Sequence, residues 1–265
     1  MKYTIGDVSE ALNLSREMIR YYEKNGVLKL SRDSSNNYRT YETMDIFWLL
    51  ESLQYRSWGV GIKEIQNVRG EDFHLKTADL FSQYAEELEK EILTKTLLKE
   101  RLEKISVKMR SSFYNLSNIH VEYIPSYYSF HLVNGYGDEY ERIDVRKEIR
   151  DVFFTSENIG FLDSGILIGD DCQEWIMTID EKYLNALHIP AAEGMTYEEG
   201  GFFLCMNSDI GEIGKMDLSE GKKIQTYADE KGFRTDGRLR GVLIGRGEVN
   251  GTFRRIMEMR MKIIA

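Results

Sequence analysis

The residues best suited to binding a charged partner lie near the N-terminus. Between positions 14 and 41, six basic residues stand against three acidic ones; the basic residues are Arg16, Arg20, Lys24, Lys29, Arg32 and Arg39. An arginine side chain binds a phosphate or a guanine edge through two hydrogen bonds. A local excess of positive charge therefore predicts contacts with the phosphate backbone of double-stranded DNA.

The overall charge is unevenly distributed. The 265 residues include 44 acidic and 35 basic ones, which gives a net charge of -9. Residues 1–73 carry -1, residues 74–113 carry +1 and residues 114–265 carry the whole deficit of -9. Because the deficit is confined to the last segment, it does not exclude nucleic-acid binding by the first.

Several chemistries find no support in the residue types and their spacing. Cys172 and Cys205 are far apart and have no ligand-spaced partner, which argues against a disulfide framework, a zinc finger or an iron–sulfur cluster. No nucleophile motif or glycine-rich phosphate loop accompanies the histidines at positions 74, 120, 131 and 188. We expect no enzyme activity, no cofactor and no metal. A leader or a membrane-spanning run is not recognisable, so we expect a cytoplasmic protein without a membrane partner.

The basic residues require elements that position them. Thr4 is suited to cap a first helix with apolar residues at helical spacing, and Ser15 to cap a second that ends at Gly26. Two short helices joined by a tight turn predict a helix-turn-helix, whose second helix enters a major groove. Turn-forming residues 33–37 precede a strand-forming run at 38–41, which predicts a wing. Helices over about 43–57 and from 62 complete a small domain, residues 1–73.

Residues 74–113 lack glycine and proline and carry a three-four apolar spacing typical of a coiled coil, at Phe81, Tyr84, Leu88, Leu98, Leu102, Ile105 and Met109. Such a helix extends about 60 Å, which is too long for a small domain to cover. We expect an antiparallel coiled coil that makes a homodimer. The alternative is a helix that packs only on its own chain.

Residues 114–265 contain short apolar runs punctuated by glycine. Gly165-Ile166-Leu167-Ile168-Gly169 resembles Gly241-Val242-Leu243-Ile244-Gly245, and a helical pattern precedes each, near 143–154 and near 218–231. The similarity predicts a duplicated β-α-β domain and an α + α/β multidomain fold. Asn250-Gly251 predicts a hairpin that joins two terminal antiparallel strands.

The N-terminal motifs resemble a known family. Ile5-Gly6-Asp7-Val8, the run from Ile19 to Leu28, Arg32 and Tyr38-Arg39-Thr40-Tyr41 look like the DNA-binding domain of MerR transcription regulators. Leu30-Ser31 and Asn37 depart from the usual proline and glycine, although asparagine tolerates a left-handed turn. The resemblance implies DNA contacts from Ser15, Arg16, Arg20, Tyr21, Tyr22, Tyr38 and Arg39. For Tyr21, a position in the core is an equal alternative. For Arg39, the lesser alternative is a solvated charge on the wing.

The family's mechanism implies further partners. Its dimers bind promoters with an overlong spacer, and the activated form bends and untwists the DNA so that RNA polymerase engages both promoter elements. Metal sensors of the family place cysteines after the dimerisation helix, but residues 111–115 contain none. Residues 114–265 instead resemble a GyrI-like effector-binding domain found in multidrug sensors, through the repeat and the run from Glu199 to Met206.

The sensor segment combines acidic charge with many aromatic residues, a mixture that attracts bulky lipophilic aromatic cations. We expect the ligand site to include Tyr127, Tyr136, Trp175, Met177 and Phe203. Drug-sensing relatives often carry a buried glutamate on the penultimate strand, but residues 241–247 contain no acid. Glu174 is the candidate counter-ion; otherwise the ligand is a neutral lipophile.

Two alternatives differ in class from a ligand-responsive activator. One is a GyrI-like hydrolase, or a binder of reactive small molecules, fused to a DNA-binding domain. The other is an effector-free architectural repressor, which would show no ligand-dependent change in transcription.

Overall fold

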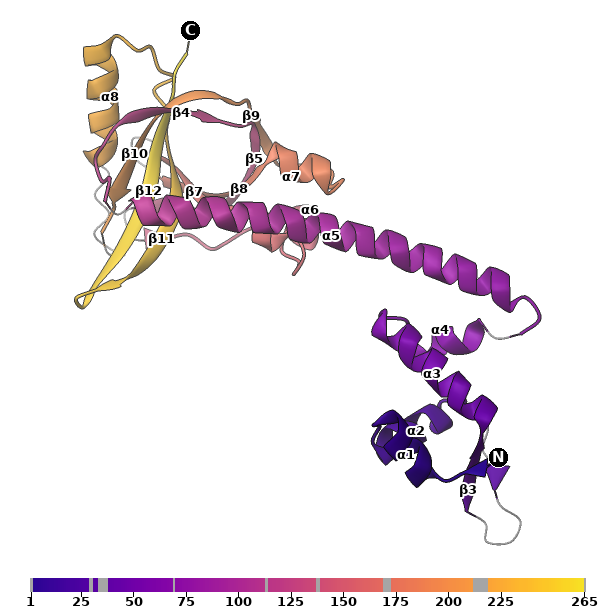
Figure 1. The fold of residues 1–265 in the computed structure, drawn as a ribbon. Coiled ribbons are helices and arrows are strands. Elements are labelled where there is room, and N and C mark those ends of the chain that lie inside the picture. The colour runs from indigo at the N-terminus through magenta and orange to yellow at the C-terminus, as the bar shows by residue number, and fades with distance from the viewer. Residues whose placement is uncertain are drawn as a thin grey trace. The chain divides into compact units, whose positions relative to one another are not determined.

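The structure of the protein is a computed structural model (Figure 1). It describes residues 2–28, 31–32, 38–68, 70–112, 114–136, 139–168, 173–211 and 219–264. The chain divides into two compact units, Met1–Glu91 and Ile92–Ala265, so the boundary falls inside a helix that we had expected to stand apart from both domains. Over the described residues, no helix is both long enough and apolar enough to cross a membrane.

The N-terminal unit begins with the predicted helix-turn-helix. Helices α1 (Ile5–Leu12) and α2 (Arg16–Lys24) are capped by Thr4 and Ser15, whose hydroxyls accept hydrogen bonds from the amides of Asp7 at 3.2 Å and Met18 at 3.1 Å. Asn13 ends α1 in the left-handed conformation, which asparagine adopts readily. These caps confirm the predicted helix starts.

The wing is a small antiparallel sheet. Over the described residues it contains three strands in the order β1 (Lys2–Tyr3), β3 (Arg39–Glu42) and β2 (Ser31–Arg32). The predicted turn at 33–37 and Lys29 lie outside the described residues, as does the side chain of Arg32. Helices α3 (Thr43–Ser57) and α4 (Ile62–Asn67) follow as predicted, and the core between these elements contains Val8, Ile19, Tyr22, Val27, Leu28, Tyr41 and Leu49.

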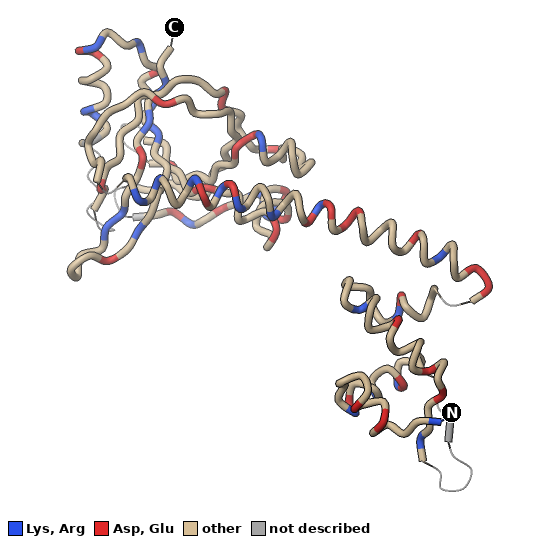
Figure 2. The backbone as a smooth tube through the Cα atoms, in the orientation of Figure 1, with Lys and Arg blue, Asp and Glu red and all other residues tan. Residues whose placement is uncertain are grey.

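Helix α5 (Phe73–Ser112) is continuous over 40 residues and carries interspersed charges of both signs (Figure 2). Its own chain covers part of the predicted seam. Phe81 and Tyr84 pack in the N-terminal unit against Tyr55 and its apolar neighbours, whereas Leu98 packs in the C-terminal unit. Leu88 and other seam residues stay exposed. The expectation that neither domain covers the helix was therefore wrong in part, because each unit covers a different stretch of it.

In the C-terminal unit, nine strands of the described chain form one sheet, and every pair of neighbouring strands is antiparallel. The sheet order is β4-β10-β12-β11-β7-β8-β5-β6, with β9 beside β5. The bounds are β4 (His120–Ile124), β5 (Tyr127–Tyr136), β6 (Glu139–Tyr140), β7 (Asp163–Ile168), β8 (Gln173–Asp180), β9 (Thr196–Glu198), β10 (Gly201–Asp209), β11 (Leu239–Val249) and β12 (Thr252–Lys262).

The order of elements repeats within this unit. If the two-residue strand β6 and a 3₁₀ turn are set aside, a strand, a helix and two strands occur as β5, α6 (Lys147–Phe153), β7 and β8. The same order occurs again as β10, α8 (Ser219–Lys231), β11 and β12. The two glycine-bounded motifs lie side by side at the centre, where Ile166 of β7 pairs with Gly241 of β11. The units are not simple β-α-β crossovers, because β8 separates β7 from β5 and β12 separates β11 from β10. The sheet is therefore antiparallel, and the fold of this unit is α+β rather than α/β.

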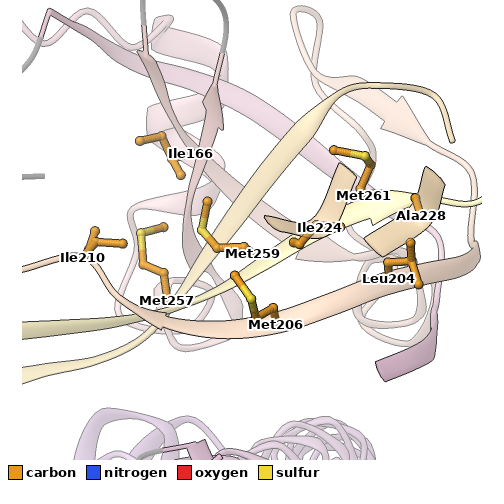
Figure 3. Close-up of a cluster of buried hydrophobic side chains, with 9 residues drawn as sticks. All are labelled: Ile166, Leu204, Met206, Ile210, Ile224, Ala228, Met257, Met259 and Met261. Atoms are coloured by element: carbon orange, nitrogen blue, oxygen red, sulfur yellow. The ribbon is translucent and has the colours of Figure 1, made fainter. Parts of the chain in front are cut away.

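Two apolar cores support the sheet. Helix α8 contributes Ile224 and Ala228 to a methionine-rich core with β10 and β12 (Figure 3), whose members are Ile166, Leu204, Met206, Ile210, Ile224, Ala228, Met257, Met259 and Met261. A second core joins α6, β5 and β8 with a 3₁₀ turn (Ile159–Phe161) and α7 (Glu181–Ala186). The predicted terminal hairpin is present, and Asn250 and Gly251 have the positive φ angles, 52° and 76°, that a tight turn of this kind requires.

Candidate DNA-binding surface and ligand cavity

Helix α2 exposes a basic stripe. Arg16, Arg20 and Lys24 follow one another at four-residue spacing and are exposed, whereas Ile19 and Tyr22 between them are buried. None of the ion pairs that join described residues involves Arg16 or Arg20. These two guanidinium groups are therefore available to an external phosphate or base edge.

The wing arginine is held by a buried carboxylate. Arg39 Nε lies 3.3 Å from Glu23 Oε2, and the Tyr41 hydroxyl also donates to Glu23. Burial and the hydrogen bond to Glu23 raise the pKa of Tyr41. Glu23 is 8% exposed, so it connects α2 to β3 from inside the domain and orients Arg39. Glu23 lies within the run from Ile19 to Leu28 that resembles MerR regulators, but no pattern in that run indicates its role in positioning Arg39.

The remaining predicted DNA contacts fall into two groups. Tyr21 and Tyr38 are exposed, at 49% and 72%, and Ser15 is exposed at the start of α2. Tyr22 is only 2% exposed, with its ring edge-to-face against Tyr21 at 5.7 Å, and burial raises its pKa. We expected Tyr22 to contact DNA, but its side chain lies on the inward side of α2 beside Ile19. Tyr22 is therefore part of the core of the N-terminal unit.

The C-terminal unit contains a cavity of about 930 Å³. The last three turns of α5 form one wall, and strands that include β4, β7, β8, β11 and β12 form the others. Apolar side chains from several of these strands line it, among them Ile124, Ile176 and Val242, together with Tyr127 at the start of β5. Its volume suits a drug-sized organic molecule.

A buried carboxylate lies in the cavity wall on the last strand. Glu258 of β12 is 1% exposed and accepts contacts from Arg260 on the same strand and from Lys108 on α5. Burial alone would raise the pKa of Glu258, but the positive charges of Arg260 and Lys108 outweigh burial and lower the pKa. Glu258 is a buried acid on the last strand, whereas the resemblance pointed to the penultimate strand and we had named Glu174 as the candidate. The alternation of methionine with charge in residues 257–261 was the signal for it.

Other charged groups of the cavity form their own pairs. Arg101 of α5 donates to both carboxylate oxygens of Asp163, at 2.7 and 3.1 Å, and to the carbonyl oxygens of Gly160 and Leu162. Burial, together with the charge of Asp163, raises the pKa of Asp180. Among the described residues that line the cavity, basic and acidic side chains are equal in number: Arg101, Lys104, Lys108, Arg240 and Arg260 against Glu103, Glu122, Asp163, Asp180 and Glu258. The cavity is thus electrically balanced and not acidic, although the domain carries -9.

The structure brings only Tyr127 of the predicted ligand residues to the described cavity wall. Trp175 and Met177 lie on the opposite face of β8, where they pack against the two apolar cores, and Ile176, Thr178 and Asp180 face the cavity instead. The strand alternation was predicted, but it could not decide between the faces.

The other three predicted ligand residues occupy different places. Phe203 is buried in a small core with Ile124, Tyr127 and Cys205. Glu174 bonds to His131 at 2.9 Å, and the side chain of Tyr136 lies outside the described residues. Glu174 therefore has a partner on β5, away from the buried ion cluster.

Three side chains offer donor atoms that lie within 4.8 Å of one another, namely Glu122, Cys205 and Glu258. Two cations already neutralise Glu258, and burial raises the pKa of Cys205 to about 12, so its thiol keeps its proton. A protonated thiol is a poor ligand and a poor nucleophile. Cys172 lies outside the described residues. The donor set does not favour a metal ion.

The two capped helices, the small sheet and the exposed arginine stripe define a winged helix-turn-helix DNA-binding domain. A family model described as MerR family regulatory protein matches residues 4–41. The N-terminal unit thus carries a MerR-family DNA-binding domain. No curated protein matches the chain.

Solved structures with some similarity include three regulators. One is HiNmlR, a MerR family regulator lacking the sensor domain, bound to promoter DNA. It is 24% identical in sequence, the match covers 42% of this chain and 85% of that chain, and the TM-score is 0.31. A second is a MerR family regulator from Listeria monocytogenes, with 26% identity, 40% and 83% covered, and a TM-score of 0.32. The third is an EcmrR–DNA complex in EcmrR-RPo, with 11% identity, 99% and 100% covered, and a TM-score of 0.32. At these TM-scores, the family match to residues 4–41 is the finding on which the assignment rests.

Proposed function

We propose that this protein is a homodimeric, ligand-responsive transcription regulator that binds promoter DNA through its N-terminal unit and a lipophilic small molecule in its C-terminal cavity. The observation that carries the proposal is the coexistence of an exposed arginine stripe on α2 with a cavity whose wall includes α5. DNA contacts by Arg16, Arg20 and Arg39 provide the phosphate binding, with Tyr21, Tyr38 and Ser15 beside them.

Dimerisation involves α5. Leu88, Ile92 and Leu102 are more than half exposed on this helix, and burying them against an antiparallel copy removes apolar surface from water. The repeated strand–helix–strand–strand order supports a duplicated, GyrI-like origin of the sensor unit. Within the sensor, Tyr127 and the residues around Glu258 replace most of the predicted ligand set.

Activation acts on the shape of the promoter. A dimer that bends and untwists an overlong spacer allows RNA polymerase to engage both promoter elements. Such a deformation costs about 1–6 kcal/mol, so an effector that favours one dimer conformation by a similar free energy is sufficient to switch transcription.

In vitro transcription from the promoter upstream of the protein's own gene tests the proposal, with RNA polymerase and a panel of aromatic cations and neutral lipophiles. We expect DNA binding in every condition and a change in transcript with at least one compound that also raises the melting temperature. If every compound leaves transcript and melting temperature unchanged, ligand sensing is refuted, and an effector-free repressor becomes the better description.

A hydrolase function receives no specific support. The pKa of Cys205 is raised to about 12, and the polar groups around Glu258 are engaged in ion pairs. Recovery of chemically unchanged ligand from the complex agrees with sensing, whereas accumulation of a hydrolysis product that depends on a cavity carboxylate contradicts it.

A further inference from the structure

The ion cluster at Glu258 connects the last strand to helix α5 across the cavity. Lys108 and Arg260 both neutralise Glu258, but they differ in their freedom to move. The Lys108 side chain is 33% exposed, whereas that of Arg260 is 14% exposed and belongs to the same strand as Glu258. A lysine ammonium on a flexible four-carbon chain reaches water with a change of rotamer. Lys108 is therefore the exchangeable cation and Arg260 the permanent one.

The charge balance favours an exchange of one cation for another. Glu258 with Arg260 is neutral, and the charge of Lys108 is offset by Glu122, whose carboxylate lies within 4.8 Å of that of Glu258. If an organic cation takes the place of the Lys108 ammonium, the charge beside Glu258 does not change, and no carboxylate is left buried without a partner. Apolar side chains nearby in the cavity, including Ile124 and Val242, are suited to hold the hydrophobic body of such a ligand.

We propose that Lys108 is a built-in competitor that occupies the cation subsite of the cavity, and that a lipophilic organic cation activates the sensor by displacing it from Glu258. The proposal rests on the proposed ligand-sensing function and adds Lys108 as the group that the ligand displaces. Displacement breaks a bond between α5 and β12, so the ligand is sensed as a release of the C-terminal end of α5. Arg101 lies on the same helix, and its hydrogen bonds to Asp163 keep α5 attached to β7 when Lys108 is displaced.

A lipophilic anion is the competing ligand class. Lys108 and Arg260 are both cations, so an anion would bind beside them without displacing either. The two classes predict opposite effects of the substitution Lys108→Met, which keeps the length of the side chain and removes its charge. A cation gains affinity when its competitor is removed, and an anion loses affinity when its partner is removed.

The test uses two ions of the same shape, tetraphenylphosphonium and tetraphenylborate, with neutral triphenylphosphine oxide, titrated calorimetrically into the full-length protein in sodium buffer. We expect Lys108→Met to bind tetraphenylphosphonium about tenfold more tightly than the wild type, because a charge-assisted hydrogen bond keeps the competitor in place by roughly that factor. Lys95→Met is the matched control, since Lys95 is exposed on the same helix and does not line the cavity. It should bind like the wild type.

Each other outcome overturns a defined claim. Unchanged affinity of Lys108→Met for tetraphenylphosphonium refutes the competitor and leaves ligand sensing intact. Weaker binding of tetraphenylborate by Lys108→Met, with no cation bound, assigns the cavity to anions. If no probe binds to either protein, both the competitor and the sensing of lipophilic ligands are refuted.

Hydrogen exchange provides a readout that does not depend on the variant. When tetraphenylphosphonium binds the wild type, amides of residues 105–112 should exchange faster, because α5 loses its bond to β12. Slower exchange in this segment means that the ligand adds to the closed helix, and it refutes displacement.

Discussion

Replacing Arg39 by alanine should weaken DNA binding mostly at low salt. The Arg39 side chain is 40% exposed and positioned by Glu23 at 3.3 Å, which suits a phosphate contact. The logarithm of the DNA affinity falls linearly with the logarithm of the salt concentration, and each phosphate contact adds about 0.9 to the steepness of that fall. The proposed dimer contains two copies of Arg39, so the slope should fall by about 1.8. The advantage of the wild type should then shrink roughly twelvefold between 50 and 200 mM salt.

Fluorescence anisotropy with a duplex selected in vitro by the wild-type protein measures this slope. The control Lys222→Ala removes one positive charge from an exposed site on α8, so any effect of net charge is subtracted. Glu23→Gln separates contact from positioning, because Arg39 keeps its charge but loses its carboxylate. Its affinity should fall with little change in slope. If Arg39→Ala has the slope of Lys222→Ala while the N-terminal unit melts normally, Arg39 does not contact phosphate.

Three further predictions concern the sensor unit. Gly241→Ala places a methyl group 2.7 Å from Cγ2 of Ile166 and should cost about 1–3 kcal/mol, lowering the melting temperature, whereas Gly247→Ala meets no atom within 4 Å and should not. Because the pKa of Cys205 is raised to about 12, a disulfide reagent at pH 8 should modify its thiol only after unfolding; equal rates in the native and unfolded protein contradict this. The pKa of Glu258 is lowered, so its contribution to stability is present above about pH 4.5 and is lost on acidification, and Glu258→Gln should flatten that dependence of the melting temperature.

The local elements were accessible from the sequence because local chemistry specifies them. Thr4 and Ser15 start their helices through hydrogen bonds to nearby amides, and Asn250-Gly251 closes a hairpin through its own backbone preference. The packing partners of α5 could not be predicted from the sequence in the same way. Phe81 and Leu98 both fit a coiled-coil seam, but each packs on a different part of the chain through contacts that spacing along one helix does not reveal.

The residues of the cavity were also hard to predict, because contacts between distant parts of the chain determine which side chains line it. Alternation in β8 correctly separated Trp175 and Met177 from Ile176, but only the packing of distant helices decides which face borders the cavity. Glu258 was missed because its partner Lys108 lies 150 positions earlier, on another element. A buried ion pair between such distant positions leaves little trace in the local sequence pattern.

The alternation along β12 also restricts how the sensor is able to move. One face of this strand carries Glu258 and Arg260, and the other carries Met257, Met259 and Met261. A slip of one residue would bring the charged groups into the methionine-rich core and the thioethers into the ion cluster. β12 is therefore locked in register, and the irregularity between Leu243 and Gly245 lies in its neighbour β11. A signal that begins at the cluster has to leave through the helix, because the strand is not free to slide.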